Sequence, residues 1–157
     1  GPALLIERLC LTTQATALHA SGPAQAMAAA LLRHWGRDGW RAHVDKARKG
    51  YRERREWMVK AVKEELGDLV EYTVPAAGMF VWLRVKNCPY TAQELINKKA
   101  VDNKVLLLPG ESFHTPANMN ADGKDSMGGV YVRAAFSVAS EEQMREATKR
   151  FRAMITQ

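Results

Sequence analysis

The most regular alternation of apolar and polar positions lies at 128–140. Successive side chains of a β-strand point to opposite faces, so the alternation sorts these residues into two sets. One face carries Val130, Val132, Ala134 and Phe136. The other carries Tyr131, Arg133, Ala135 and Ser137. The pattern predicts a strand over 130–138, on which Arg133 is the only charged residue.

Two interpretations of Arg133 follow from these residues alone. A guanidinium held on a strand beside small residues is well placed to bind a carboxylate through two parallel N–H···O bonds. Most arginines on strands are simply solvated, however, and composition alone favours that reading. The residues therefore leave both a solvated and a carboxylate-binding Arg133 open.

Other strands are predicted earlier in the chain. Alternation over 70–74 predicts a half-buried strand, and the pattern resumes over 79–85 after the interruption at Pro75-Ala76-Ala77-Gly78. Gly78 has two interpretations, a turn glycine or a point where a ligand passes close to the backbone, and the turn is favoured. The apolar residues at 105–108, halted by Pro109-Gly110, predict a further short strand.

Helical periodicity with start and stop signals predicts helices over 3–18, 21–35, 39–66, 92–103 and from Ser140 onward. Gly36 and Gly67 are expected to end the second and third of these. Thr91-Ala92-Gln93-Glu94 and Ser140-Glu141-Glu142-Gln143 have the pattern of capping boxes, which predicts the starts of the last two.

The order of elements is helices followed by β-β-α-β-β-α. It predicts an α+β fold, with helices on one face of a small, mostly antiparallel sheet, preceded by a helical arm. The stretch 111–129 lacks periodicity, and a loop of that length is usually functional or mobile. Phe113 is expected to anchor its start, while Glu111 and His114 are weak site candidates.

Composition narrows the function classes. The chain has 157 residues, 46% hydrophobic and 25% charged, as in an ordinary folded domain. Its net charge of +6 is concentrated at 33–63, which reads as a solvated helix face or one that meets an acidic partner. No aromatic-rich basic groove accompanies this charge, so nucleic-acid binding is not expected.

Three further expectations follow from composition. The longest apolar run, 26–32, is far short of a membrane span, so no membrane partner is expected. The four histidines are scattered without a ligand pattern, which predicts no metal site. Cys10 and Cys88 stand alone, which predicts buried or inert thiols in a reducing compartment.

Four separated motifs resemble the C-terminal part of the pyridoxal phosphate (PLP)-dependent aminotransferases of fold type I. The most similar subgroup is the kynurenine / α-aminoadipate / aromatic amino acid aminotransferases. The motifs are Gly1-Pro2 with Leu5-Ile6-Glu7-Arg8, Pro75-Ala76-Ala77-Gly78-Met79-Phe80, Leu107-Leu108-Pro109-Gly110, and Val132-Arg133-Ala134-Ala135-Phe136-Ser137 followed by Ser140-Glu141-Glu142-Gln143-Met144.

The resemblance implies roles for particular residues. Arg133 is expected to bind the α-carboxylate of the amino acid substrate, and Gly78, Met79 and Phe80 are expected to shape the pocket for its side chain. The implied reaction moves an amino group from an aromatic or aminoadipate-like amino acid to a 2-oxo acid. No catalytic residue is expected in this chain, because the family's Schiff-base lysine and phosphate-binding groups correspond to sequence upstream of Gly1.

The chain is therefore expected to be the C-terminal piece of a larger, homodimeric enzyme. Residues 1–38 would form a helical arm packed on the large PLP-binding domain, and residues 39–157 the long helix and the small C-terminal domain. The isolated piece is expected to bind no pyridoxal 5'-phosphate and to be inactive. The expected location is the cytoplasm, with mitochondria left open.

Two alternatives from other classes stay open. The same kind of domain occurs in transcription regulators that fuse a DNA-binding winged helix to an aminotransferase-like domain and sense an amino acid. The chain could also be a non-catalytic module that dimerises through its helical arm.

Overall fold

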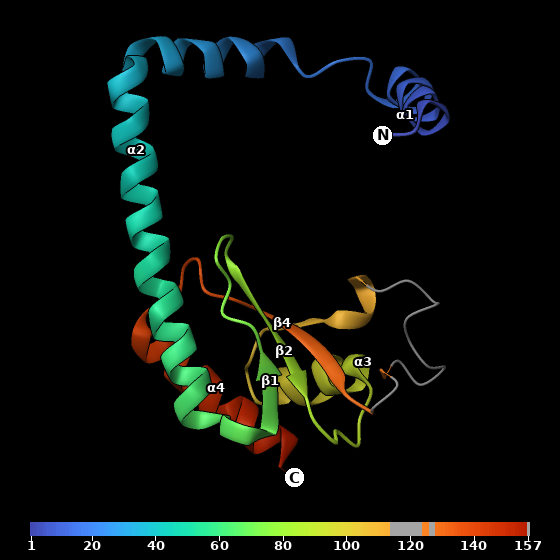
Figure 1. Cartoon of the computed structure of the whole chain (residues 1–157), viewed down its shortest axis with the longest axis vertical. Helices are drawn as coiled ribbons and strands as arrows, with labels where there is room; N and C mark the ends of the chain where they lie inside the picture. Colours follow the sequence, from blue (N-terminus) through green and yellow to red (C-terminus); the bar gives the residue numbers. More distant parts are fainter. Residues whose placement is uncertain (114–123, 126–127, 157) are drawn as a thin grey trace. The chain divides into compact units, whose positions relative to one another are not determined.

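The computed structural model describes residues 1–113, 124–125 and 128–156. Within it the chain divides into two compact units, Gly1–Lys46 and Ala47–Gln157. The first unit is entirely helical outside its turns, and the second contains the sheet (Figure 1). The sequence prediction that 1–38 packs on another domain stays a prediction.

The first unit contains α1 (Ala3–Thr16) and the beginning of α2 (Gly22–Glu65). At Gly36 the backbone of α2 leaves helical geometry (φ 58°, ψ −168°), which confirms the predicted break. A positive φ of this kind is open to glycine at little cost. No residue of α1 is buried, and its large apolar side chains are exposed: Leu4, Leu5, Ile6, Leu9 and Leu11.

The second unit is built on a four-stranded sheet with the order β1-β2-β4-β3. The strands are β1 (Val70–Tyr72), β2 (Phe80–Val85), β3 (Leu108–Pro109) and β4 (Val130–Ala135). All neighbouring strands pair antiparallel, as the sequence predicted. In the central pair, Val81 lies opposite Ala134 and Trp82 lies opposite Arg133.

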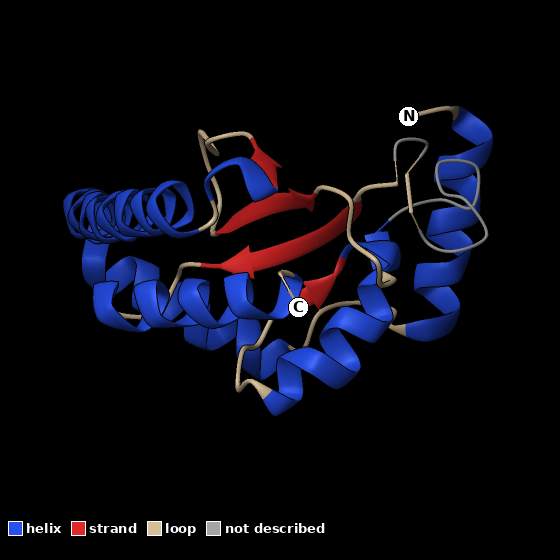
Figure 2. Ribbon diagram, turned by 90° about the horizontal axis from the view of Figure 1, so that it is seen from below, coloured by secondary structure: helices blue, strands red, loops and turns tan. Residues whose placement is uncertain are grey.

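One face of this sheet forms the core. Its buried strand residues are Val70, Val81, Leu83, Val85, Val130, Val132 and Ala134. Helices cover this face (Figure 2): the C-terminal part of α2, α4 (Glu141–Ile155), and α3 (Ala92–Glu94), which continues into the π-helix η2 (Leu95–Ala100). Met58 and Val62 of α2 and Met144, Phe151 and Met154 of α4 complete the core. The helices are thus on one face, as predicted.

Local signals placed several boundaries correctly. Both capping boxes are formed, at Thr91 with Glu94 and at Ser140 with Gln143. The long helix α2 ends at Glu65, and the following Gly67 has a φ of +47° at the start of the short 3-10 helix η1 (Gly67–Leu69). The side chain of Arg152 donates to the carbonyl of Glu65 at 2.8 Å, which joins α4 to the end of α2.

The predicted strand over 105–108 is wrong in position. Val105 N–H bonds the carbonyl of Ala100, so this residue still belongs to the exit from the helix. Lys104 makes that exit with a φ of +55°, and Leu106 is 95% exposed. Only Leu108–Pro109 pairs with β4. An apolar run shows that part of a segment is buried, but it does not show which residues reach the ladder. The predicted strands over 70–74 and 130–138 are also longer than β1 and β4.

The two cysteines differ in environment. Cys88 is 3% exposed, and its burial raises the pKa of its thiol. Cys10 is exposed on α1, which contributes no buried residue in its unit. Of the two expected states, buried or inert, Cys10 therefore does not have the first.

This difference predicts selective alkylation of the native chain. The thiolate is the reactive form, and Cys88 combines burial with a raised pKa, so Cys10 should react with iodoacetamide much faster at pH 8. Mass spectrometry of the Cys10→Ser variant checks this. Labelling of Cys88 should then require denaturant, and rapid labelling of the native variant would contradict the assigned burial.

Candidate functional site

The face of the sheet opposite the core carries the predicted site residue Arg133. This residue lies on β4 between its strand partners Trp82 of β2 and Leu108 of β3. Its position in the alternation directs the side chain away from the core, as the sequence predicted. Arg133 is half-buried as a residue, with its Nε buried.

Aromatic rings hold the guanidinium of Arg133. Its Cζ lies 4.1 Å from the centroid of the Phe80 ring and 4.5 Å from that of the Phe113 ring. At these distances a cation is attracted to the negative face of a ring. Trp82 meets Phe113 edge to face, with 5.1 Å between ring centroids. The rings of Phe80, Trp82 and Phe113 therefore give a planar cation an apolar setting.

Arg133 has no hydrogen-bond or salt-bridge partner among the residues that the structure describes. Its Nε is buried without a partner. A buried donor left unpaired costs about 1–3 kcal/mol. A buried donor without a partner calls for an explanation, and a ligand group is one of the explanations.

The neighbouring Arg84 on the same face shows the contrast. Its Nη1 donates to Glu71 at 3.1 Å, and its Nη2 donates to Asp125 Oδ1 at 3.0 Å. Its Nε donates to the other oxygen of Asp125. The hydrogen bond from Arg84 to Asp125 is the main reason that the pKa of Arg84 is raised above its ordinary value. Arg84 is thus a structural cation, fully engaged by two carboxylates.

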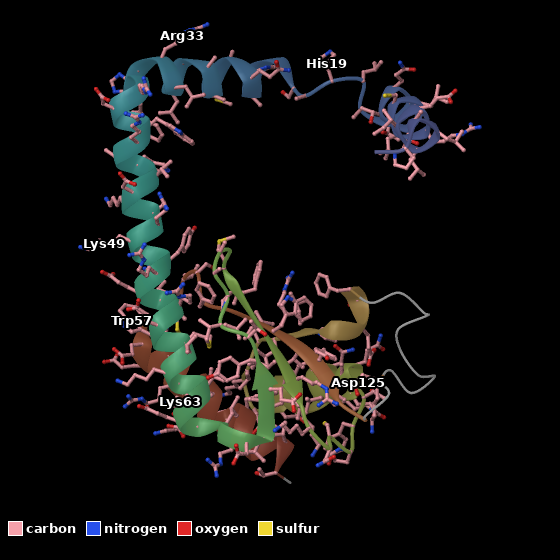
Figure 3. All side chains as sticks on the ribbon, viewed as in Figure 1. His19, Arg33, Lys49, Trp57, Lys63 and Asp125 are labelled. Atoms are coloured by element: carbon pink, nitrogen blue, oxygen red, sulfur yellow. The ribbon has the colours of Figure 1, made fainter. Side chains whose placement is uncertain are left out.

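The carboxylate of Asp125 also fixes the chain entering β4. It accepts a hydrogen bond from Gly129 N–H at 2.8 Å, while Arg84 passes so close that a Cβ on Gly129 would lie 2.6 Å from its Cζ. Figure 3 shows Asp125 among the side chains at this end of the sheet. Gly129 is therefore required by close packing.

Gly78 and Met79 occupy the turn that leads into β2. Gly78 has a φ of +85°, which confirms the turn, and the space where a Cβ would lie is open. The carbonyl of Met79 accepts a hydrogen bond from Phe136 N–H at 3.0 Å. Gly78 lines a groove of about 290 Å³ together with Arg52 and Arg55.

The structure therefore brings only part of the predicted site together. Phe80 contacts Arg133 and also lines a second groove of about 630 Å³, beside Trp82 and Tyr72. Among the described residues, no hydrogen bond, ion pair or cation–π contact joins Gly78 or Met79 to Arg133. Their assignment to a side-chain pocket stays a prediction.

Sequence reasoning missed Trp82, and it named Glu111 only as a weak site candidate. Trp82 shares a face with Phe80 by alternation, and this signal could have found it. Glu111 lies in the 3-10 helix η3 (Gly110–Phe113), and its Oε1 accepts from Ala92 N–H at 2.9 Å and Gln93 N–H at 3.3 Å. No local pattern in the sequence predicts that contact. His114, the other weak candidate, lies outside the described residues.

Two lysines of this unit are engaged by carboxylates. Lys60 lies 3.4 Å from Glu141 and Lys86 lies 3.6 Å from Glu71, both in solvent-accessible ion pairs. A Schiff-base lysine is instead activated by desolvation or by a nearby cation. Among the described residues there is also no His, Cys, Asp and Glu group arranged to hold a metal ion. No described helix is long and apolar enough to cross a membrane.

Comparison with known proteins adds to this geometry. No family model matches the chain. Over 155 residues it is 37% identical to the mitochondrial kynurenine/alpha-aminoadipate aminotransferase of Bos taurus, a match that covers 99% of this chain and 34% of that protein. Its relatives include the kynurenine/alpha-aminoadipate aminotransferase of Mus musculus, to which it is 38% identical over 155 residues, or 99% of this chain and 34% of that protein. The chain spans about a third of the length of the curated relatives it matches.

Two further similarities bear on fold and function. The chain superposes on LysN, the alpha-aminoadipate aminotransferase of Thermus thermophilus, with a TM-score of 0.74 and 24% identity, over 97% of this chain and 35% of that one. This likeness confirms the predicted fold. The chain is also 28% identical, over 93% of its length and 27% of the relative's, to an uncharacterized HTH-type transcriptional regulator of Bacillus subtilis, YdfD.

The difference in burial between the two carboxylate partners of Arg84 predicts unequal effects on stability. Asp125→Asn removes the charge that Arg84 needs at a nearly buried site, so the free energy of unfolding should fall by about 1–3 kcal/mol. Glu71→Gln affects a half-exposed partner and should cost less than about 1 kcal/mol. Urea unfolding followed by circular dichroism measures both. Equal losses would show that Asp125 is not the principal partner.

Proposed function

We propose that this chain is the part of a PLP-dependent aminotransferase that binds the α-carboxylate of the amino acid. The proposed donors are aromatic or aminoadipate-like amino acids, and the acceptor is a 2-oxo acid. One observation carries the proposal, the guanidinium of Arg133 without a carboxylate partner in the described chain, held between Phe80 and Phe113 on the face opposite the core. The similarity to kynurenine/alpha-aminoadipate aminotransferases supports it.

The geometry favours a planar anion as the ligand of Arg133. The rings of Phe80 and Phe113 lie near the guanidinium, while the residue stays half-buried with an accessible part. A carboxylate that approaches in the guanidinium plane meets two parallel N–H donors and forms a charge-assisted pair. The apolar rings exclude water from this pair, which strengthens its electrostatic attraction.

The role of Arg133 is to orient the substrate. An arginine side chain offers N–H donors and no acceptor, so Arg133 acts by binding and not by proton transfer. By fixing the carboxylate it fixes which bond of Cα faces the reacting group, and orientation of this kind supplies part of the rate. When bound, pyridoxal 5'-phosphate supplies an electron sink for Cα chemistry. The residues described here contribute binding and orientation only.

The activity belongs, in this proposal, to a protein that also contains the PLP-binding portion of its relatives. The exposed ion pairs of Lys60 and Lys86 support the view that this chain alone lacks transaminase activity. We also propose that the intact protein is a homodimer. The dimer covers the exposed apolar side chains of α1. The bovine relative is mitochondrial by name, and the compartment of this protein stays a prediction.

An amino-acid-sensing regulator is the second candidate, because the chain is also similar to a transcriptional regulator. The same Arg133 would then hold an amino acid without turning it over. The full reading frame separates the two candidates. An upstream winged helix together with absent transaminase activity would select the regulator.

Replacing Arg133 tests the proposed function in the reading frame that contains this chain. Arg133→Ala removes a charge-assisted hydrogen-bonded pair worth about 1.5–3 kcal/mol, so KM for kynurenine and for 2-aminoadipate should rise by about 10- to 100-fold. Affinity for PLP, measured by absorbance titration, should not change.

The matched control is Arg145→Ala, which removes an exposed arginine of α4 that pairs with Glu64. It should leave KM unchanged. An unaltered KM in Arg133→Ala would remove the role that we assign to Arg133.

A further inference from the structure

We propose that Phe113 is a positioning residue that orients Arg133, and that Glu111 holds Phe113 in place by capping α3. The inference rests on the proposed function of Arg133 and extends it to two residues that do not pair with the substrate carboxylate. In this inference, contacts from α3 to η3 and from η3 to Arg133 together orient the guanidinium for binding a carboxylate.

The two rings that contact Arg133, Phe80 and Phe113, are held in different ways. Phe80 belongs to β2 and is held by the ladder that pairs it with Ala135 of β4. Phe113 instead ends η3, which has four residues. One ring against Arg133 is therefore fixed by the sheet, whereas the position of the other depends on what holds η3.

Packing alone does not explain the position of Phe113. Phe113 is 49% exposed, so about half of its surface is left uncovered by the described fold. Its described ring partners are Arg133 and Trp82, both on the face opposite the core. Phe113 is a large aromatic residue that is half exposed and stacks on Arg133. It therefore contributes more to the position of Arg133 than to packing of the core.

The short helix η3 is held by contacts at its start and in its middle. At its start, Gly110 packs so tightly on Tyr131 that an added Cβ would lie 2.6 Å from the Tyr131 carbonyl oxygen. In its middle, the Glu111 carboxylate accepts the backbone N–H groups of Ala92 and Gln93. These N–H groups belong to the first turn of α3, where the helix dipole favours an anion.

The hydrogen bonds from Ala92 and Gln93 to Glu111 are not needed merely to start α3. Thr91 and Glu94 already form a local capping box at the same end of α3. Glu111 adds a second acceptor from 18 or 19 residues away. A remote carboxylate on a helix that has its own cap chiefly joins two segments. Here it joins η3 to α3, two residues before Phe113.

Side-chain NMR of the 157-residue chain tests the device without any enzymatic reaction. Arg133→Lys assigns the Nε–H signal of Arg133, whose nitrogen is buried in the structure. Phe113→Leu should speed exchange of this proton with water by about tenfold or more, because one ring cover is lost. Phe113→Tyr should restore the slow exchange.

Glu111→Gln should accelerate the same exchange to a smaller extent, because the amide keeps an acceptor but loses the charge. The matched control is Glu146→Gln, on an exposed ion pair with Arg150 of α4, which should leave the exchange unchanged. If Phe113→Leu and Glu111→Gln lower only the melting temperature and leave the exchange of Arg133 Nε–H unchanged, the positioning role is refuted.

Kinetics of the longer reading frame separate this inference from the proposed function. Phe113→Leu should raise KM for the amino acid and for the 2-oxo acid by about three- to tenfold, with kcat nearly unchanged, because the variant must order Arg133 on binding. If Arg133→Ala raises KM but Phe113→Leu does not, the positioning role fails alone. If Phe113→Leu speeds the exchange of Arg133 Nε–H but Arg133→Ala leaves KM unchanged, the proposed function is wrong. The stacking of Phe113 on Arg133 would then still be confirmed.

Discussion

The antiparallel register between β2 and β4 determines the chemistry of both faces of the sheet. It sets Val81 against Ala134 in the core and Trp82 against Arg133 on the opposite face. Because side chains alternate with a period of two, a shift of one residue would exchange the faces and bring Arg133 into the core. Burial of Val81 and Ala134 in the core therefore places Trp82 and Arg133 on the opposite face. The proposal that Arg133 binds a carboxylate depends on this strand register.

The two arginines of the face opposite the core show how a fold separates a structural charge from a functional one. Arg84 has its charge balanced by Asp125 and Glu71, and it fastens the chain that enters β4. Arg133 is surrounded by rings, which attract a cation without neutralising it. Both side chains are placed by the same strand pairing, so their difference comes from their neighbours.

The sequence was informative where structure is local. Alternation assigned the faces of β4, the capping boxes marked α3 and α4, and Gly36 and Gly67 marked helix breaks. It failed where the outcome depends on contacts between distant segments. The apolar run at 105–108 did not reveal that only Leu108 and Pro109 reach the ladder. The stacking of Phe113 on Arg133 and the cap from Glu111 to α3 likewise depend on the return of a chain segment, which no local pattern specifies.

The π-helical turn η2 (Leu95–Ala100) has a consequence for how this region tolerates changes in length. A π-turn holds one residue more per hydrogen-bonded ring than an α-helix, and such turns commonly occur as a local bulge in an α-helix. Because the π-turn absorbs one extra residue, deleting one residue there would restore α-helical bonding with little rotation of the residues beyond it. Leu95, Ile96 and Ala100 are buried on this segment, so a related chain one residue shorter here should keep an ordinary α-helical turn with the same face on the core.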